Sequence, residues 1–400
     1  MSSNSDLHKL IHRKPKPPRY EPITVAEALR RLHLYLHTVI ELGAYAFLSS
    51  DREASKHIID LEAIVDEVAY QLLLHMSLAV GHDITGAPYA TPIYMYVFGV
   101  DKIMDSFKDL ASLVLRGLAP SPKIYRGLVA VSDVVVARLP GDRVDGVSIR
   151  ELCSSYAIEV LALLRRGKWI LEPSREVVAS TDIVYVKGFK ENVNELLTSV
   201  GLRPVPEEPP SASLANVLRQ VDSMIDMLLV FNDLAHYQLK AQDPKLAEEL
   251  LEMEVFFDDL RIEVSRSIIG LGAIGADDRF SLLTLVTRLE DVSDSLTYII
   301  GLPAEEEYRD VLSGLVEAEE ERISVFKAAR RVKLSELADK LEDLGASILA
   351  VRRDSEWIAV TPYNISKLEC RPGDSILVSY SRTLEDYVVK LLEENGLARV

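Results

Sequence analysis

The stretch "LEAIVDEVAYQL", residues Leu61–Leu72, places two acidic residues four positions apart on an otherwise apolar segment. Its apolar residues recur every three or four positions, which is the period of an α-helix with one buried face. Glu62 and Asp66 then lie on the same side of that helix, where like charges cost a few tenths of a kcal/mol. The stretch "MEVFFDDLRIEV" repeats the pattern with Glu254 and Asp258, 192 residues later. This repetition indicates a duplicated helical unit.

Other parts of the chain repeat in the same order. Between the two copies, "RPVPEEPPSAS" (203–213) is acidic, rich in proline and without apolar period, so we expect a linker there. The repeated pairs are "ELGAYAFLSSD" (41–51) with "DLAHYQLKAQD" (233–243), "VDKIMDSF" (100–107) with "LEDVSDSL" (289–296), "YRGLV" (125–129) with "YRDVL" (308–312), and "LALLRRGKWILEP" (161–173) with "LAVRRDSEWIAVTP" (349–362).

In each copy the apolar period changes from that of helices to that of short strands. We expect three long helices, packed as an antiparallel bundle, and then a small β-α-β-β-α domain with room for one further strand. Asp51 and Asp243 are suited to cap the second helix of each bundle. The expected helices are 24–48, 52–80, 92–118, 213–241, 244–269 and 280–302.

The sequence therefore predicts a multidomain α and α+β protein. The expected parts are a basic flexible tail (1–22), helical domain 1 (23–120), small domain 1 (121–203), the linker (204–212), helical domain 2 (213–304) and small domain 2 (305–400).

Composition limits the functions that fit. With 48% hydrophobic and 27% charged residues, the chain is expected to fold and to be soluble. The formal net charge of −17 argues against nucleic-acid binding, which needs a basic face. Cys153 and Cys370 have no metal-type spacing, which fits a reducing cytoplasm. We expect no signal peptide and no membrane-spanning segment, because the longest uncharged run, 84–100, contains two prolines.

The small domains resemble a known family. "GVSIRELCSSYAIEVLALLRRGKWILEPSREVVASTDIVYVKG" (146–188) is similar to the TrkA-C domain, the C-terminal half of the RCK regulatory units of potassium channels and transporters. The first copy has Ser180-Thr181-Asp182 where that family has Gly-Asp. The second copy keeps Pro372-Gly373-Asp374 but lacks the glycine turn before Trp357.

The helical domains resemble PhoU-like domains, which carry an acid-x-x-x-Asp pattern on their second and third helices. Here the pattern falls on Glu62 with Asp66, and on "VDKIMDSFKDLASLV" (100–114). The opening "RYEPITVAEAL" (19–29) is also similar to archaeal-type chains that fuse PhoU-like and TrkA-C domains. Together the two resemblances cover nearly the whole chain after the tail.

These resemblances imply a cytoplasmic regulatory subunit of a potassium or cation transport system, which could reach the membrane through its transporter partner. The alternative is a PhoU-type metal-binding adaptor that regulates phosphate uptake or signalling. TrkA-C domains of some relatives bind cyclic di-AMP between two domains, and such domains usually pair, so a homodimer is expected. A small-molecule ligand, a nucleotide among them, is therefore an expected partner.

Some PhoU-like proteins hold metal clusters on their acidic motifs, and oxygen ligands suit divalent cations, iron or manganese. The predicted metal-binding residues are Glu62, Asp66, Asp101, Asp105, Asp109, Glu254, Asp258, Glu290 and Asp294. Glu41 or Asp233 could add a ligand. Because Tyr298 replaces Asp109 in the second copy, we expect the site of the second copy to have one carboxylate ligand fewer. The alternative is that these acids pair with the nearby bases Lys102, Lys108, Arg261 and Arg288.

Arginines end the central strand of each small domain. Arg165, Arg166, Arg352 and Arg353 could bind a phosphate group of a nucleotide, since the guanidinium fork suits phosphate, or they could be ordinary strand-end charges. Trp169 and Trp357 occupy matching positions, and we expect both to pack in a core or an interface.

Two histidines four residues apart, His33 and His37, have metal-ligand spacing without the pattern of a zinc hydrolase, so a solvated helix face is expected. No Gly-rich phosphate loop or nucleophile motif is present in the sequence, so we expect a protein that is not an enzyme. The missing Gly-rich loop also means that a regulator of this kind would sense something other than NAD.

Overall fold

The computed structural model describes residues 25–80, 90–272, 274–302, 321–342, 344, 346–354, 356–360, 364–381 and 384–400. The expected basic tail, the repeat motif at Tyr308 and the proline that ends "WIAVTP" lie outside these residues. Among the described residues the chain combines long helices with small antiparallel sheets, as expected of an α and α+β protein. No described helix is long and apolar enough to cross a membrane.

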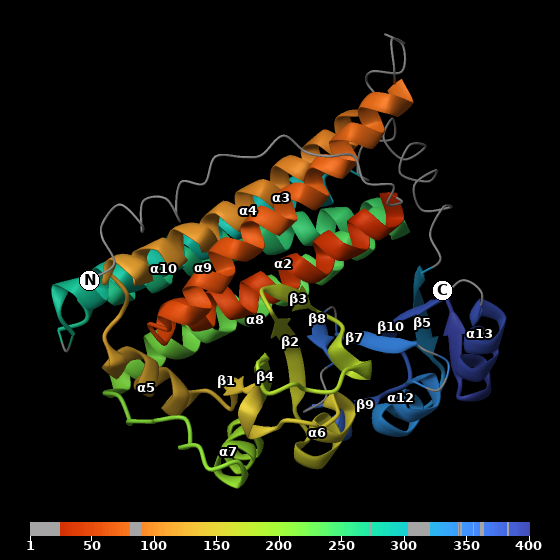
Figure 1. Cartoon of the computed structure of the whole chain (residues 1–400). Helices are drawn as coiled ribbons and strands as arrows, with labels where there is room; N and C mark the ends of the chain where they lie inside the picture. Colours follow the sequence, from red (N-terminus) through yellow and green to blue (C-terminus); the bar gives the residue numbers. More distant parts are fainter. Residues whose placement is uncertain are drawn as a thin grey trace.

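Long helices form one layer of the molecule (Figure 1). Equivalent helices of the two copies contact each other: α2 of the first copy packs on α8 of the second, and α4 packs on α10. The copies therefore form an internal pair of bundles. The helices are α2 Val25–Leu48, α3 Arg52–Val80, α4 Thr91–Arg116, α8 Ala212–Ala241, α9 Pro244–Gly270 and α10 Ala276–Ile300.

The helix starts follow the local sequence. Asp51 accepts hydrogen bonds from the backbone N–H groups of Glu53 and Ala54, and Asp243 accepts one from that of Lys245, so both predicted caps are confirmed. Helix α10 begins four residues before the predicted position 280. Its first turn carries Asp277 and Asp278, whose negative charge favours a helix N-terminus.

Small domain 1 contains one strand more than the basic β-α-β-β-α pattern. Its antiparallel sheet has the order β1-β4-β2-β3. Helix α5, Pro122–Val131, precedes this sheet and packs on α8, which the sequence did not predict. The elements are β1 Val134–Pro140, α6 Ile149–Tyr156, β2 Glu159–Arg165, β3 Lys168–Ile170, β4 Ile183–Phe189 and α7 Lys190–Ser199.

Small domain 2 repeats this arrangement and adds a strand at the edge. Its main sheet has the order β11-β5-β10-β7-β8, beside a short β6-β9 pair. Its elements are β5 Glu321–Ala328, β6 Val332–Lys333, α12 Leu334–Glu342, β7 Ser347–Arg353, β8 Glu356–Ala359, β9 Glu369–Cys370, β10 Ser375–Ser381, α13 Glu385–Glu394 and β11 Leu397–Arg399.

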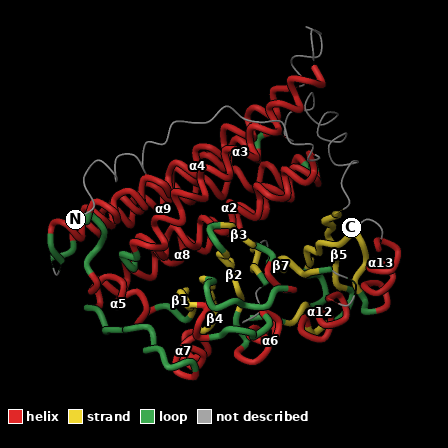
Figure 2. The backbone as a smooth tube through the Cα atoms, viewed as in Figure 1, coloured by secondary structure: helices red, strands yellow, loops and turns green. Residues whose placement is uncertain are grey.

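Both sheets lie under the helical layer, and short helices cover their other sides (Figure 2). Tyr185 of β4 and Leu377 of β10 belong to the same apolar core as the long helices. Residues on the opposite sheet faces form separate cores, with Leu196 of α7 in one and Leu392 of α13 in the other. Each sheet is thus buried on both faces, and one face joins it to the helices.

Candidate functional site

Carboxylates converge between α9 and α10. One carboxylate oxygen from each of Glu254, Asp258 and Asp294 lies within 4.8 Å of the others. Burial, a hydrogen bond with Asp294 and the charge of Asp258 raise the pKa of Glu254 to about 7. The pKa of Asp294 is raised as well, first by burial. A proton shared by crowded carboxylates is what a metal cation would displace, so this group can hold a divalent ion.

Glu290 borders this cluster but has a basic partner. Its Oε1 lies 3.6 Å from Nε of Arg261. Burial and the charge of Asp294 raise the pKa of Glu290, although Arg261 lowers it. Glu290 is therefore a neighbour of the converging carboxylates rather than one of them.

The corresponding acids of the first bundle share a lysine. Nζ of Lys108 donates to Glu62 and lies 3.8 Å from Oδ1 of Asp105. Burial and the charges of Glu62 and Asp101 raise the pKa of Asp66 to about 6. Burial likewise raises the pKa of Asp101. These four acids lie close enough to affect one another, with one ammonium group among them.

The second bundle has the more convergent carboxylates, contrary to the expectation from Tyr298. Within the described residues, only Glu254, Asp258 and Asp294 bring three carboxylate oxygens within 4.8 Å of one another. The bundles also differ in their bases: Lys108 binds Glu62 in the first, where the repeat places Thr297 in the second, and Arg261 lies beside Glu290 in the second. Asp109 does not join the first cluster: its Oδ2 lies 2.8 Å from Nη2 of Arg288 on α10.

The two clusters border one cavity between α4 and α10. Its volume is about 460 Å³, and it contains Asp105 of the first cluster and Asp294 of the second. Bases from both helices, Lys102, Lys108 and Arg288, also line it. Three of the predicted metal ligands, Glu62, Asp109 and Glu290, instead pair with bases, as the alternative in the sequence analysis states. Among the described residues, Glu254 and Asp258 have no basic partner within salt-bridge distance.

The strand-end arginines bind carboxylates of their own domains. Arg165 donates to the buried carboxylate of Asp182, at 2.8 Å from Nη2 to Oδ2, and Arg353 donates to Asp374 with the same separation. Each aspartate also accepts from a turn N–H, that of Ala179 at 2.8 Å and that of Arg371 at 2.9 Å. Arg165 and Arg353 therefore occupy equivalent positions in the repeat. Each arginine stabilises the turn that precedes β4 in small domain 1 or β10 in small domain 2.

The other two arginines differ. Arg352 lies 2.5 Å from Oε2 of Glu249 on α9, with its guanidinium 5.8 Å from the centre of the Trp357 ring. Arg166 is exposed at the β2–β3 turn, with φ of 51°. A phosphate-binding role for the four arginines stays a prediction. Trp169 stacks on Tyr185 beneath the helices, which agrees with the expected packing role.

Two histidines of α2 bind an aspartate of α8, where the sequence led us to expect a solvated face. Asp233 Oδ1 lies 2.8 Å from Nε2 of His33 and 3.2 Å from Nδ1 of His37. Burial alone would lower the pKa of His37, but Asp233 raises it to about 9. The ring of His33 stacks on that of His236, 4.4 Å away. Asp233 is therefore committed to these histidines and adds no ligand to the acidic clusters.

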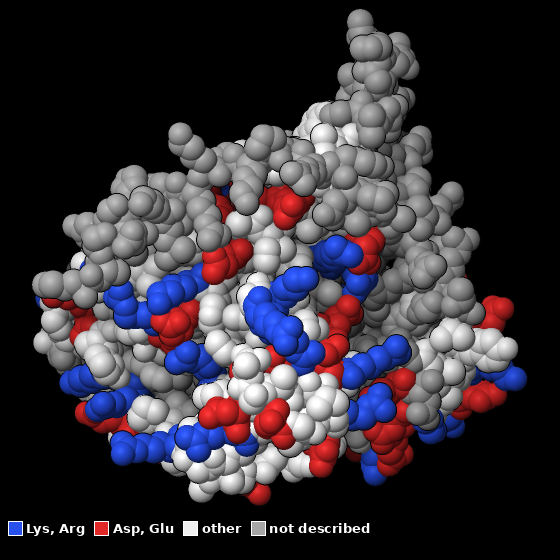
Figure 3. Space-filling model, viewed as in Figure 1, with Lys and Arg blue, Asp and Glu red and all other residues white. Residues whose placement is uncertain are grey.

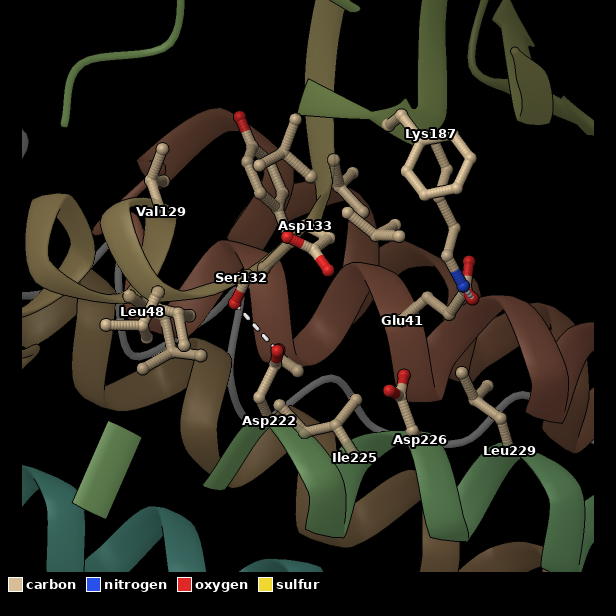
Figure 4. Close-up of a pocket in the computed structure, with 18 of the residues that line it drawn as sticks. Glu41, Leu48, Val129, Ser132, Asp133, Lys187, Asp222, Ile225, Asp226 and Leu229 are labelled. Carbon is tan, nitrogen blue, oxygen red and sulfur yellow. Dashed lines mark hydrogen bonds and ion pairs between the residues drawn. The ribbon is translucent and has the colours of Figure 1, made fainter. Parts of the chain in front are cut away.

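Glu41 likewise lies outside the acidic clusters. Nζ of Lys187, on β4, donates to its Oε1, while its Oε2 is buried and has no hydrogen-bond partner among the described residues. Glu41 lines a second cavity with Asp222 and Asp226 of α8 (Figure 4). The sequence analysis missed this cavity because its residues are far apart in the chain and follow no common motif.

Comparison with known proteins gives weak structural likenesses. No protein-family model matches the sequence, and no curated protein is similar to it. The structure is similar to the phosphate transport system regulatory protein PhoU from Streptococcus pneumoniae, with 12% identity, a TM-score of 0.40, and coverage of 79% of this chain and 97% of that one.

Two further likenesses concern RCK domains. The GsuK RCK domain gives 14% identity, a TM-score of 0.18, and coverage of 66% of this chain and 64% of that one. The GsuK channel bound to NAD gives 11% identity, a TM-score of 0.18, and coverage of 75% and 66%. All three TM-scores lie below 0.5, so these likenesses carry no argument about fold or function.

Proposed function

We propose that the protein is a non-enzymatic regulatory subunit that binds cations on its helical carboxylates and controls a membrane transporter of potassium or another cation. The observation that supports this proposal is the convergence of Glu254, Asp258 and Asp294 to within 4.8 Å, with a raised pKa at Glu254. Such a group exchanges protons for a metal ion near neutral pH. Iron, manganese or another divalent ion suits its all-oxygen ligands.

The cation signal would pass from helices to sheets through direct contacts. Arg352 of β7 binds Glu249 of α9, the helix that also carries Glu254. A change in α9 upon cation binding would therefore reach small domain 2. In this proposal the small domains bind a nucleotide such as cyclic di-AMP and contact the transporter in the cytoplasm, and two chains pair as a homodimer.

Metal content tests the proposal. We expect the purified protein, dialysed against Mn²⁺ or Fe²⁺ and then against buffer, to retain metal measured by plasma mass spectrometry. Glu254→Gln/Asp258→Asn should lose most of it. Glu62→Gln/Asp66→Asn is the matched control from the first bundle, and it should lose less because Lys108 already binds Glu62. Negligible metal in the wild-type protein would contradict cation binding.

A second candidate function is regulation of phosphate uptake or signalling by a PhoU-type adaptor. It is favoured by the acidic motifs, which occur on the second and third helices of both bundles, as in PhoU-like domains. Cross-linking in native membranes, followed by mass spectrometry, separates the two candidates. A potassium or other cation transporter supports the first, and a phosphate transporter supports the second.

A further inference from the structure

The second cavity lies where α2 crosses α8, and it belongs to both copies of the repeat. Its volume is about 440 Å³, within the range of small-molecule sites. Side chains of α2, α5, β1 and β4 line it from the first copy, and one face of α8 lines it from the second. Asn364, from small domain 2, completes the lining.

The face of α8 in this cavity alternates acidic and apolar side chains. Asp222, Ile225, Asp226 and Leu229 recur at helical spacing and point toward the elements opposite (Figure 4). Ser132 donates to Oδ2 of Asp222 at 2.7 Å. Burial raises the pKa of Asp222 to about 6 and also raises that of Asp226. The cavity therefore presents two carboxylates one helical turn apart beside apolar walls.

The charges that line the cavity are mostly negative. Four carboxylates line it, those of Glu41, Asp133, Asp222 and Asp226, against the single ammonium group of Lys187. Lys187 pairs with Oε1 of Glu41. Glu41 is only 4% exposed, and its buried Oε2 has no partner in the part of the chain that the structure describes. An unpartnered buried carboxylate oxygen costs free energy unless a hydrogen-bond donor reaches it.

Two features favour an organic rather than an inorganic cation. Within the described residues, no three of these carboxylates bring oxygens within 4.8 Å of one another, so they do not form a chelating group. The remaining wall is apolar and aromatic, including Leu48, Val129 and Tyr45. Such a wall suits a hydrocarbon body, and tyrosine faces attract ammonium groups.

We propose that this cavity binds a small organic cation, a protonated amine or guanidine with an apolar body, whose charged group meets Asp222 and Asp226. The bound molecule joins α8 of the second copy to the helices and sheet of the first. This site goes beyond the proposed function, because none of its residues belongs to the carboxylate clusters of α3, α4, α9 or α10.

Calorimetry on the full chain tests the proposal with benzamidine, 4-phenylbutylamine and spermidine, at constant ionic strength. Benzamide and 4-phenylbutanol serve as neutral counterparts of the first two. We expect at least one cationic probe to bind one to one, and benzamidine or 4-phenylbutylamine to bind at least tenfold tighter than its counterpart. Asp222→Asn/Asp226→Asn should weaken binding at least tenfold, whereas Asp142→Asn/Asp145→Asn, two exposed positions outside the cavity lining, should leave it unchanged.

A cavity-filling variant, Ile225→Trp, gives independent evidence and should also weaken binding at least tenfold. Circular dichroism checks that each variant remains folded. The proposal is overturned if no cationic probe binds, if the neutral counterparts bind as tightly, or if the Asn variant binds like the wild-type protein. Competition by millimolar Mg²⁺ at constant ionic strength would show a site for inorganic cations and would also overturn it.

Discussion

The two ends of the α2–α8 crossing contain equivalent positions of the repeat but different side chains. On one side, Asp233 of α8 meets His33 and His37 of α2. The repeat places Glu41 at the position of Asp233, and Ile225 and Leu229 at the positions of the histidines. On that side a cavity remains, and Lys187 of the sheet pairs with the glutamate instead. Thus the side chains of Asp233 and the two histidines fill one end of the α2–α8 crossing, which we call the filled crossing. A cavity remains at the other end, the open crossing.

Basic and acidic groups are intermixed over the face of the small domains seen in Figure 3. The two copies also diverge in the helical layer. Within the helical layer, Lys108 binds Glu62 in one acidic cluster, while Thr297 stands at the matching position beside the other cluster, where the pKa of Glu254 is raised. The duplicated chain therefore has different sites at equivalent positions, both at the two ends of the α2–α8 crossing and in the two acidic clusters. Such a difference suits a protein that responds to more than one ligand.

The largest difference between the two ends of the α2–α8 crossing should appear when Asp233 or Glu41 is replaced. We expect Asp233→Ala to lower the free energy of unfolding by about 2–3 kcal/mol, because it leaves two partly buried histidines unpaired. Glu41→Ala should cost about 1 kcal/mol, since the charges of Glu159 and Asp226 still act on Lys187. Urea denaturation followed by circular dichroism measures both. Equal losses would mean that the two sides are energetically alike.

The small domains should behave alike instead. Asp182 and Asp374 each bind an arginine and a turn N–H with nearly the same distances. Asp182→Ala and Asp374→Ala should each cost about 2 kcal/mol, because each removes the aspartate that an arginine binds and leaves a turn N–H without its acceptor. The free energy of unfolding is again the measurement, with exposed Asp145→Ala as a control that changes nothing. A loss in one domain only would contradict their structural equivalence.

Local patterns predicted the elements well. Apolar period and caps located the long helices, and strand composition indicated the order of a small β-α-β-β-α domain, because both depend on residues within a few positions of each other. The edge strand β11 and the short β6–β9 pair were not predicted. Helix α5 was missed because its ten residues follow a proline within a stretch that we assigned to the small domain.

Contacts between distant residues were harder to predict. Asp233 lies 200 positions from His33, and nothing in either sequence segment marks the other as its partner. Lys108 was recognised as a possible base for the first cluster, yet its effect depends on which acid it reaches. Arg165 has the chemistry of a phosphate site and of a strand-end salt bridge, and only the position of Asp182 distinguishes them.

The filled crossing should also respond to pH. Because Asp233 raises the pKa of His37 from 6.5 to about 9, the folded protein binds more protons than the unfolded chain between these values. Its contribution to stability is full below about pH 6.5 and is lost as the pH rises through about 9. We expect a loss of about 1–2 kcal/mol, allowing for solvent screening. His37→Gln should remove this part of the pH dependence, whereas Leu229→Gln at the matching position should not.

The acidic clusters should give the smallest effects, with opposite signs. The pKa of Glu254 is raised from 4.5 to about 7, so its folded form binds extra protons and loses stability as the pH rises through this interval. At pH 8, without metal, Glu254→Gln should therefore stabilise the protein by about 0.5 kcal/mol, because it removes repulsion from Asp258 and Asp294. Glu62→Gln should destabilise it by a similar amount, because Lys108 loses its partner.

Added Mn²⁺ sharpens this contrast. In the wild-type protein it should raise the melting temperature by replacing the shared proton of Glu254, and Glu254→Gln should abolish most of the gain. Glu62→Gln should keep the gain, since Lys108 already competes with metal in the first bundle. The opposite result, in which Glu62→Gln abolished the gain in melting temperature and Glu254→Gln kept it, would place the cation site in the first bundle. The presence of Thr297 in place of a lysine would then not explain why the two bundles differ in cation binding.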